Sequence, residues 1–192
     1  NLTIVPDNNK PLPKKELKSN QIFQRVENSG INFTHKEDNY VDFNRQKLIP
    51  YQISDRGPAV AVGDLNNDGE EDIFFGGSKF TPAEIFIQND SIYNRVNYSP
   101  ISNDSISEDV VAVISDFNND KLNDLLIGSG GGDFYNKMDP LKDRYFTQTD
   151  STFSKEMMPN YFGNSSVVRP FDYDKDGDLD VFIGSYAATN DF

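Results

Sequence analysis

The sequence has no cysteine and only one histidine, His35, among its 192 residues. The absence of cysteine excludes disulfide frameworks, thiolate catalysis and cysteine-type zinc sites. A single histidine disfavours a Ser-His-Asp triad or a histidine metal site, and His35 is expected to be a polar residue at the end of a strand. No run of about 18 apolar residues occurs, so no segment is predicted to span a membrane.

Basic residues are also scarce, because 18 Lys and Arg stand against 31 Asp and Glu, for a formal charge of -13. Such a charge repels nucleic acid and anionic membranes, so neither is expected as a partner. It suits a cation-binding protein, although charge alone fits simple solubility equally well. The start of the chain lacks the basic-then-apolar pattern of a signal peptide. Its first 20 residues, with Pro6, Pro11 and Pro13, predict a polar tether.

Three segments repeat one pattern of an apolar run, an Asp/Asn-rich loop and a second apolar run that ends in Gly or Ser. They read AVAVGDLNNDGEEDIFFGG, VAVISDFNNDKLNDLLIGSGG and VVRPFDYDKDGDLDVFIGS. Their loops begin at Asp64, Asp116 and Asp172, 52 and 56 residues apart. This period fits a propeller blade of about four strands.

The apolar runs are predicted to be strands, because they are short, rich in Val, Ile and Phe, and bounded by Gly, Asn and Asp. Their near-continuous apolarity indicates burial on both faces. Further strands are expected over 84–88, 93–98, 145–149 and 152–155, with an inserted loop from Gly130 to about Arg144. The predicted fold is all-β, with about three blades of an incomplete β-propeller. Its parts are a tether (1–20), lead-in strands (21–56), blade one (57–108), blade two with the inserted loop (109–160) and a partial blade three (161–192).

The loops carry the candidate chemistry, because oxygen-bearing side chains recur at positions 1, 3, 5 and 9 counted from the first Asp of each loop. Calcium takes about six to eight hard oxygen ligands in tolerant geometry. A tight turn directs positions 1, 3 and 5 inward, position 7 offers a backbone carbonyl, and position 9 closes the shell. The predicted calcium ligands are Asp64, Asn66, Asp68, Glu70 and Asp72; Asp116, Asn118, Asp120, Leu122 and Asp124; and Asp172, Asp174, Asp176, Asp178 and Asp180.

Similar residue types also occur in EF-hands, in magnesium sites and in ordinary hairpin turns. An EF-hand needs a glutamate at position 12 and flanking helices, whereas position 12 is Phe75, Ile127 or Ile183 in an apolar run. Magnesium demands stricter octahedral geometry, so calcium is preferred. Hairpin turns are rich in Asp, Asn and Gly. However, a spacing repeated three times, with crowded carboxylates that repel one another without a cation, favours metal binding.

The three sites are not expected to be equal. The third has four carboxylates and a glycine at position 6, and the first has three carboxylates with Gly69 at that position. The second has Lys121 there, which costs about 1 kcal/mol if the backbone is left-handed. Lys121 also adds a positive charge beside the ion. We therefore expect calcium affinity to rank third, first, second.

The loop pattern, followed by a strand ending in Gly-Gly or Gly-Ser, resembles the FG-GAP/VCBS repeats of integrin-α-type β-propellers. The lead-in from Phe23, FQRVENSGINFTH followed by DFNRQKLIPYQISDRGPAVAVGD, is similar to bacterial VCBS-repeat proteins related to cartilage acidic protein, the ASPIC/UnbV group. The resemblance covers about residues 21–192, and Lys121 departs from its motif. It implies a calcium-rigidified, non-catalytic scaffold that binds proteins or glycans outside the cytoplasm, at a bacterial outer membrane or in the periplasm.

The resemblance also implies an incomplete propeller, whose open edges would pair with missing blades or with another copy. The alternative is a non-catalytic part of a larger carbohydrate-active enzyme whose active site lies outside this chain. The run Gly130–Gly132 lacks the Lys-Ser/Thr of a phosphate loop, so a loop hinge is expected there. The pairs Glu108–Asp109 and Glu37–Asp38 have no supporting context for catalysis, so no enzyme is predicted. Some aromatic side chains are candidates for ligand contact, although strand packing is their commoner use: Tyr93, Tyr98, Phe134, Tyr135 and Tyr145.

Overall fold

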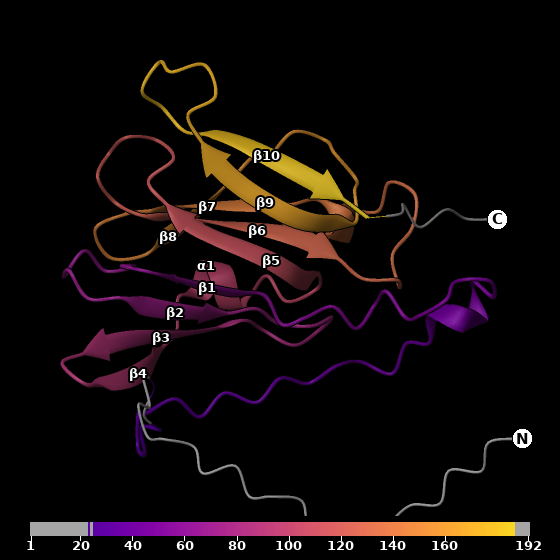
Figure 1. Ribbon diagram of the computed structural model, residues 1–192, viewed down its shortest axis with the longest axis horizontal. Coiled ribbons are helices and arrows are strands. Elements are labelled where there is room, and N and C mark those ends of the chain that lie inside the picture. Colours follow the sequence, from indigo (N-terminus) through magenta and orange to yellow (C-terminus); the bar gives the residue numbers. More distant parts are fainter. Residues whose placement is uncertain (1–22, 24, 187–192) are drawn as a thin grey trace, which may run out of the picture.

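The computed structural model describes residues 23 and 25–186, which form an all-β fold of three antiparallel sheets (Figure 1). The first sheet contains β1 (Val60–Gly63), β2 (Asp72–Phe75), β3 (Glu84–Asn89) and β4 (Ile92–Val96). The second contains β5 (Glu108–Ser115), β6 (Asp124–Gly130), β7 (Arg144–Gln148) and β8 (Phe153–Glu156). The third contains β9 (Ser165–Phe171) and β10 (Asp180–Ser185).

Helical structure is limited to three short segments in the described residues, α1 (Ser99–Ser102) and the 3-10 turns η1 (Asp42–Asn44) and η2 (Asp139–Leu141). Within the described part of the chain, no helix has the length and apolarity needed to cross a membrane.

Within each sheet the strands are hydrogen-bonded in chain order, as short connections between antiparallel neighbours require. The first two strands of the sheets coincide with the apolar runs of the three repeats, so the strand prediction is confirmed. Their registers also agree: Val62 pairs with Ile73, Ile114 with Leu125, and Pro170 with Val181, each just inside the loop. Residues at the same place in the three sequence repeats therefore occupy equivalent positions in the three sheets.

The sheets lie one above another, with the third sheet at the top of Figure 1. The first strands of the three sheets are neighbours, since β1 contacts β5 and β5 contacts β9. One apolar core lies between the first two sheets, where Phe74, Leu125 and Phe146 are fully buried. Burial of such side chains supplies the main stabilisation of a fold of this kind.

Burial on both faces, predicted for the apolar runs, is found in β6 but not in β1, where Val60 and Val62 are 51% and 52% exposed, nor in β10. Every residue of β6 is buried, because β6 lies between neighbours on both sides. Phe182 on β10 is 56% exposed, whereas the equivalent Phe74 and Leu126 are 0% and 2% exposed. Among the described residues the third sheet packs only on the second, since β9 contacts β5 and β6, and its other face is exposed at Phe182.

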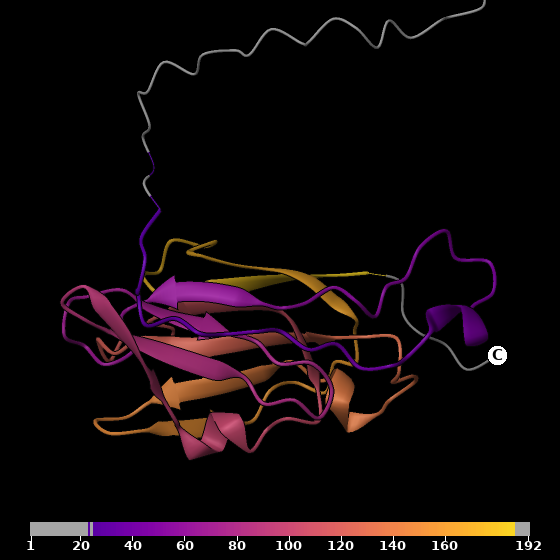
Figure 2. The ribbon, with the colours of Figure 1, turned by 90° about the horizontal axis from the view of Figure 1, so that it is seen from below.

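The lead-in differs from the prediction of strands over residues 21–56. Its described residues contain no strand and run in extended form past the first sheet to η1 (Figures 1 and 2). One backbone hydrogen bond joins it to β4, from the Tyr93 amide to the Ser29 carbonyl at 2.8 Å, and Phe33 stacks on Phe75 with ring centroids 4.5 Å apart. The segment thus attaches mainly by side chains rather than by a ladder of backbone bonds. The predicted tether (1–20) lies outside the described residues.

Two buried carboxylates join neighbouring sheets. They are Asp109 at the start of β5 and Asp143 just before β7. Asp109 accepts the Gly77 amide of the first sheet at 2.8 Å and the Arg144 Nη2 at 2.6 Å. Asp143 accepts the Ser129 amide and the Ser165 hydroxyl, both at 2.8 Å, and so joins the second sheet to the third. Buried polar groups need such partners, because leaving one unpaired costs about 1–3 kcal/mol.

Candidate metal centre

The three Asp/Asn-rich loops connect β1 to β2, β5 to β6 and β9 to β10, so they lie at the same end of the three sheets (left in Figure 1). Strands, not helices, flank each loop, and position 12 falls inside β2, β6 or β10. The exclusion of an EF-hand is therefore confirmed.

The backbone follows one course in all three loops. Position 6 is left-handed, with φ of 90° at Gly69, 74° at Lys121 and 98° at Gly177. The left-handed conformation that makes lysine costly at position 6 is thus present. Position 4 is left-handed as well, with φ from 61° to 64° at Asn67, Asn119 and Lys175.

The aspartate at position 1 organises each turn through backbone amides. In the first loop Asp64 accepts the Asp68 amide at 3.2 Å and the Gly69 amide at 2.8 Å. In the second loop Asp116 accepts the amides of Asp120 and Lys121 at 3.2 and 2.9 Å. These bonds hold the carboxylate on the inner side of the turn, beside positions 5 and 6.

The corresponding turn of the third loop brings three carboxylates together. One oxygen from each of Asp172, Asp174 and Asp176 lies within 4.8 Å of the others, and all three residues are exposed. Asp172 also accepts the Gly177 amide at 3.2 Å. Three hard, anionic oxygens at this separation form a donor set that suits calcium.

Crowding of acidic groups extends to position 7 of this loop, Asp178. The Asp178 amide donates to Asp176 at 3.1 Å, and this bond lowers the pKa of Asp176. The hydrogen bond to Asp176 and the charges around it raise the pKa of Asp178. Carboxylates that share a site raise one another's pKa, as the charges around Asp178 do, and a bound cation relieves the repulsion.

Asparagine takes position 3 in the first two loops. Asn66 accepts the Asp68 amide at 3.0 Å and donates from its side-chain nitrogen to the Asp68 carboxylate at 2.7 Å. Asn118 makes the same two bonds with Asp120, at 3.0 and 2.9 Å. Positions 1, 3 and 5 are therefore adjacent in every loop, with one fewer carboxylate in the first two.

The aspartate at position 9, predicted to close the calcium shell, accepts backbone hydrogen bonds from outside its turn in the first two loops. Asp72 is fully buried and accepts the Leu65 amide at 2.7 Å and the Gln88 amide at 2.8 Å. Asp124 is equally buried and accepts the amides of Phe117 at 3.3 Å and Gln148 at 2.9 Å. Burial raises the pKa of both aspartates. Each of these aspartates therefore joins its loop to the third strand of its sheet.

In the third loop Asp180 accepts the Tyr173 amide at 2.8 Å and lies outside the cluster of Asp172, Asp174 and Asp176. The position-7 residues of the first two loops, Glu70 and Leu122, donate their amides to the position-5 carboxylates, both at 2.8 Å. The same geometry at position 7 for a charged and an apolar residue indicates that the side chain there is not needed for the turn.

The structure shows two features of the loops that the sequence pattern did not predict. One is the left-handed backbone at position 4, which Asn67 and Asn119 signal because asparagine tolerates that conformation. The other is the brace at position 9. Its signal is a glutamine, Gln88 or Gln148, found at the same position of the third strand in both four-stranded sheets.

The other candidate groups have structural partners. The His35 Nε2 lies 2.6 Å from Glu37 in the irregular lead-in, so its predicted place at the end of a strand is wrong. Gly131 is left-handed, with φ of 94°, at the end of β6 where the inserted loop begins. Asp109 is engaged by Arg144 and Gly77, so it does not act as a free partner of Glu108.

The aromatic residues considered for ligand contact are mostly packed. Phe134 is 6% exposed, and Tyr98 packs edge-on against Phe153. Tyr145 packs edge-on against Phe117 and donates its hydroxyl to Asp124 at 2.5 Å. Their packing role is therefore the one that the structure supports.

A scan against protein-family models finds no match to this chain, and a search of curated proteins finds none either.

Proposed function

We propose that this chain is a calcium-stabilised, non-catalytic scaffold built from β-propeller blades of the FG-GAP/VCBS type. The observation that carries the proposal is the recurrence of one loop. Three loops share their spacing, their left-handed backbone at positions 4 and 6, and their place at one end of consecutive sheets. Ordinary hairpin turns in one chain are not expected to share their spacing, their left-handed positions and their place in the sheet.

Calcium is the cation that fits the loop chemistry best. The third loop offers three carboxylates whose oxygens lie within 4.8 Å of one another, and the first two offer two carboxylates and an amide oxygen. Hard oxygens and an adaptable turn suit calcium better than magnesium or a transition metal. A bound ion would offset the repulsion among the carboxylates and rigidify the turn between the first two strands of each sheet.

The arrangement of the sheets supports the propeller part of the proposal. Four-stranded antiparallel sheets whose first strands are neighbours are the unit from which propellers are built by radial repetition. The open face of the third sheet, with Phe182 exposed, is where a further blade or another copy would pack. We place the protein at the cell surface or in the periplasm and give it a protein or glycan ligand, on the strength of the family resemblance.

Thermal unfolding in chelator and in calcium tests the calcium part of this proposal. Binding to the native state alone stabilises it by about 2.7 kcal/mol for one site when free calcium is 100 times its Kd. We expect the wild type to gain stability and Asp172→Ala to lose most of the gain. Asp150→Ala, which removes an exposed aspartate from the β7–β8 turn, is the matched control and should keep the gain.

A glycan-array screen with and without chelator, beside a polysaccharide-degradation assay, tests the binding part. Calcium-dependent capture of a glycan without degradation supports the scaffold. Degradation by this chain alone would contradict the absence of catalysis.

A further inference from the structure

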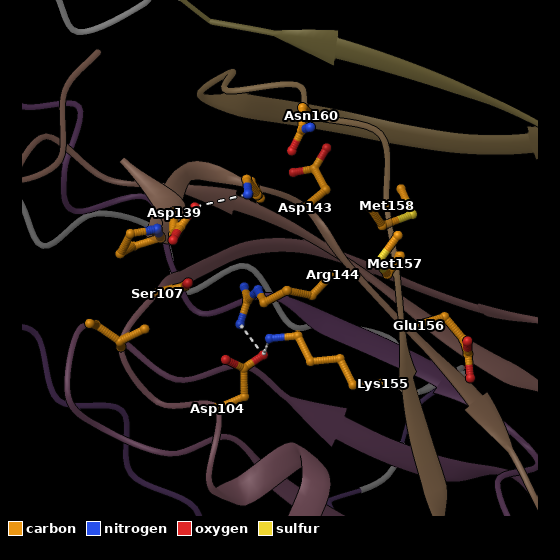
Figure 3. Close-up of a pocket in the computed structure, with 13 residues that line it drawn as sticks. Asp104, Ser107, Asp139, Asp143, Arg144, Lys155, Glu156, Met157, Met158 and Asn160 are labelled. Carbon is orange, nitrogen blue, oxygen red and sulfur yellow. Dashed lines mark hydrogen bonds and ion pairs between the residues drawn. The ribbon is translucent and has the colours of Figure 1, made fainter. Parts of the chain in front are cut away.

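A cavity of about 500 Å³ lies at the end of the second sheet opposite the Asp/Asn-rich loops (Figure 3). Three connections line it: the segment before β5, the inserted loop before β7, and the segment after β8. Its volume is in the range of about 300–1,000 Å³ that small-molecule sites occupy. It shares no residue with the loops of the proposed metal sites.

The inserted loop marks this cavity as a departure from the repeat. The connection from β6 to β7 spans residues 131–143, whereas the equivalent connection from β2 to β3 spans only 76–83. The additional residues include η2, and Asp139 and Pro140 of that turn form part of the wall. Insertions in repeat proteins gather on one face, which is often the binding face.

The charges also depart from the repeat. In the first sheet Glu84 and Arg95 form an ion pair at 3.2 Å on the surface. The registers make Arg144 and Lys155 the equivalents in the second sheet, so two cations stand where the first sheet has opposite charges. Asp104 lies 3.8 Å from Arg144 and 2.8 Å from Lys155, and Arg144 is also paired with the buried Asp109 at 2.6 Å.

These cations keep unused hydrogen-bond donors. The Arg144 Nη1 lies 3.8 Å from Asp104, which is longer than a hydrogen bond, and the Lys155 ammonium spends only one of its three donors on Asp104. The Arg144 side chain is 4% exposed and that of Lys155 is 47% exposed. Asp109 and Ser129 occupy the Nη2 and Nε sides of the guanidinium, so its Nη1 and the Lys155 ammonium are the donors that can reach a ligand carboxylate.

The opposite wall carries negative charge. Figure 3 shows Asp143 and Asn160 across the cavity from Arg144 and Lys155, with the two methionines on a third side. The Asp143 carboxylate accepts the Ser129 amide and the Ser165 hydroxyl, which leaves it an acceptor position, since a carboxylate has about four. Asp143 replaces Ala83 of the first sheet, so this carboxylate too is a feature of the second sheet alone.

From these walls we infer that the cavity binds an α-amino-acid zwitterion, either a free amino acid or a short peptide with free ends. The ligand carboxylate lies toward Arg144 and Lys155, and its ammonium lies toward Asp143. An apolar side chain packs on Met157 and Met158, whose flexible thioethers accommodate varied shapes. This inference does not depend on calcium binding by the loops, because it rests on different residues at the other end of the sheets.

Chemical-shift titration of the full chain tests the inference, with L-leucine and the dipeptide Leu-Leu as probes. We expect saturable shifts confined to the residues that line the cavity, in the three connections and at the adjoining ends of β7 and β8. N-acetyl-leucine and leucine methyl ester each lack one of the two charges and should bind at least about tenfold more weakly, as the loss of one charge-assisted hydrogen bond predicts. Tighter binding of the dipeptide assigns a peptide ligand, and tighter binding of leucine assigns a free amino acid.

Two variants separate this site from a general charge effect. Lys155→Met should weaken binding about tenfold, whereas Arg95→Met, at the equivalent position of the first sheet, should leave it unchanged. Three results would overturn the inference. They are a folded chain that gives no saturable shift with either probe, affinity that survives loss of either ligand charge, and equal effects of the two variants.

Discussion

Asp109 and Arg144 form a buried ion pair, with 2.6 Å between Oδ1 and Nη2 and side chains that are each 4% exposed. The second oxygen of Asp109 accepts the Gly77 amide at 2.8 Å, so the pair joins β5 and β7 to the first sheet. Removing one partner of such a pair leaves a buried charge uncompensated, which costs about 3–5 kcal/mol. Asp109→Ala should lower the free energy of unfolding by about this amount in urea denaturation.

The equivalent surface pair provides the control for this prediction. Glu84 and Arg95 are 21% and 57% exposed, and exposed pairs contribute about 0–1 kcal/mol. Glu84→Ala should therefore change stability little. Equal losses from Asp109→Ala and Glu84→Ala would show that the buried pair does not tie the sheets together.

The aspartate at position 9 of the second loop should stabilise the fold without calcium. Asp124 accepts two backbone amides and the Tyr145 hydroxyl, at distances from 2.5 to 3.3 Å. Asp124→Ala leaves these donors unpaired in a buried place, and we expect a loss of about 2–4 kcal/mol in chelator. Urea unfolding of the chelated protein measures it.

Asp116→Ala is the matched comparison, because Asp116 belongs to the same loop and its hydrogen bonds are exposed. In chelator it should cost much less than Asp124→Ala. If both variants were as stable as the wild type in chelator and weakened only in calcium, position 9 would be a metal ligand alone and the brace would be refuted.

The parts of the fold that depend on residues close together in the chain can be predicted from the sequence. The first two strands of each sheet and the spacing of the loops follow from short apolar runs and turn residues, and both are found. The tie between Gly77 and Asp109 spans 32 residues and depends on how two sheets meet. The lead-in shows the same limit, because its apolar residues pack onto the first sheet without forming a ladder, and apolarity alone cannot distinguish these outcomes.

In the candidate site, too, contacts within one turn can be predicted from the sequence and contacts to other strands cannot. Positions 1, 3 and 5 lie together because a tight turn brings near residues together. The aspartate at position 9 also accepts a backbone amide of the third strand, such as that of Gln88, and no spacing within the loop reveals this bond. The cavity could not be predicted from the sequence, since its walls come from three separate connections.

Lys121→Gly should stabilise the second loop. Lys121 has φ of 74°, a conformation that costs a residue with a side chain about 1 kcal/mol and costs glycine little. We expect a gain of about 1 kcal/mol in chelator and, because a positive charge is removed, tighter calcium binding as well. Urea unfolding and calcium titration of the same variant measure the two effects.

The control for this prediction is Lys121→Ala, which removes the charge and keeps the backbone cost. If alanine and glycine stabilised the chelated protein equally, the effect would come from charge, and the left-handed backbone at position 6 would carry no cost.

Glu108 should make stability fall as the pH rises. Burial first, and then the charges of Glu37, Asp38 and Asp55, raise the pKa of Glu108 from 4.5 to about 8. The folded chain therefore holds this proton more tightly than the unfolded chain between those values. The stabilisation is fully present below pH 4.5 and is lost as the pH rises through about 8.

Urea unfolding at pH 5 and pH 8 measures this effect. The wild type should lose on the order of 3 kcal/mol more than Glu108→Gln between these pH values, because glutamine does not titrate. Other buried carboxylates titrate in both proteins, so the difference between the two isolates Glu108. Parallel stability profiles would contradict the assignment.

Calcium titration of the calcium-free chain by calorimetry measures directly whether the Asp/Asn-rich loops bind calcium. We expect saturable calcium binding at more than one site, with the tightest site abolished by Asp172→Ala and a weaker one by Asp116→Ala. The absence of saturable binding by the folded wild type, or a larger loss from Asp116→Ala than from Asp172→Ala, would contradict this expectation.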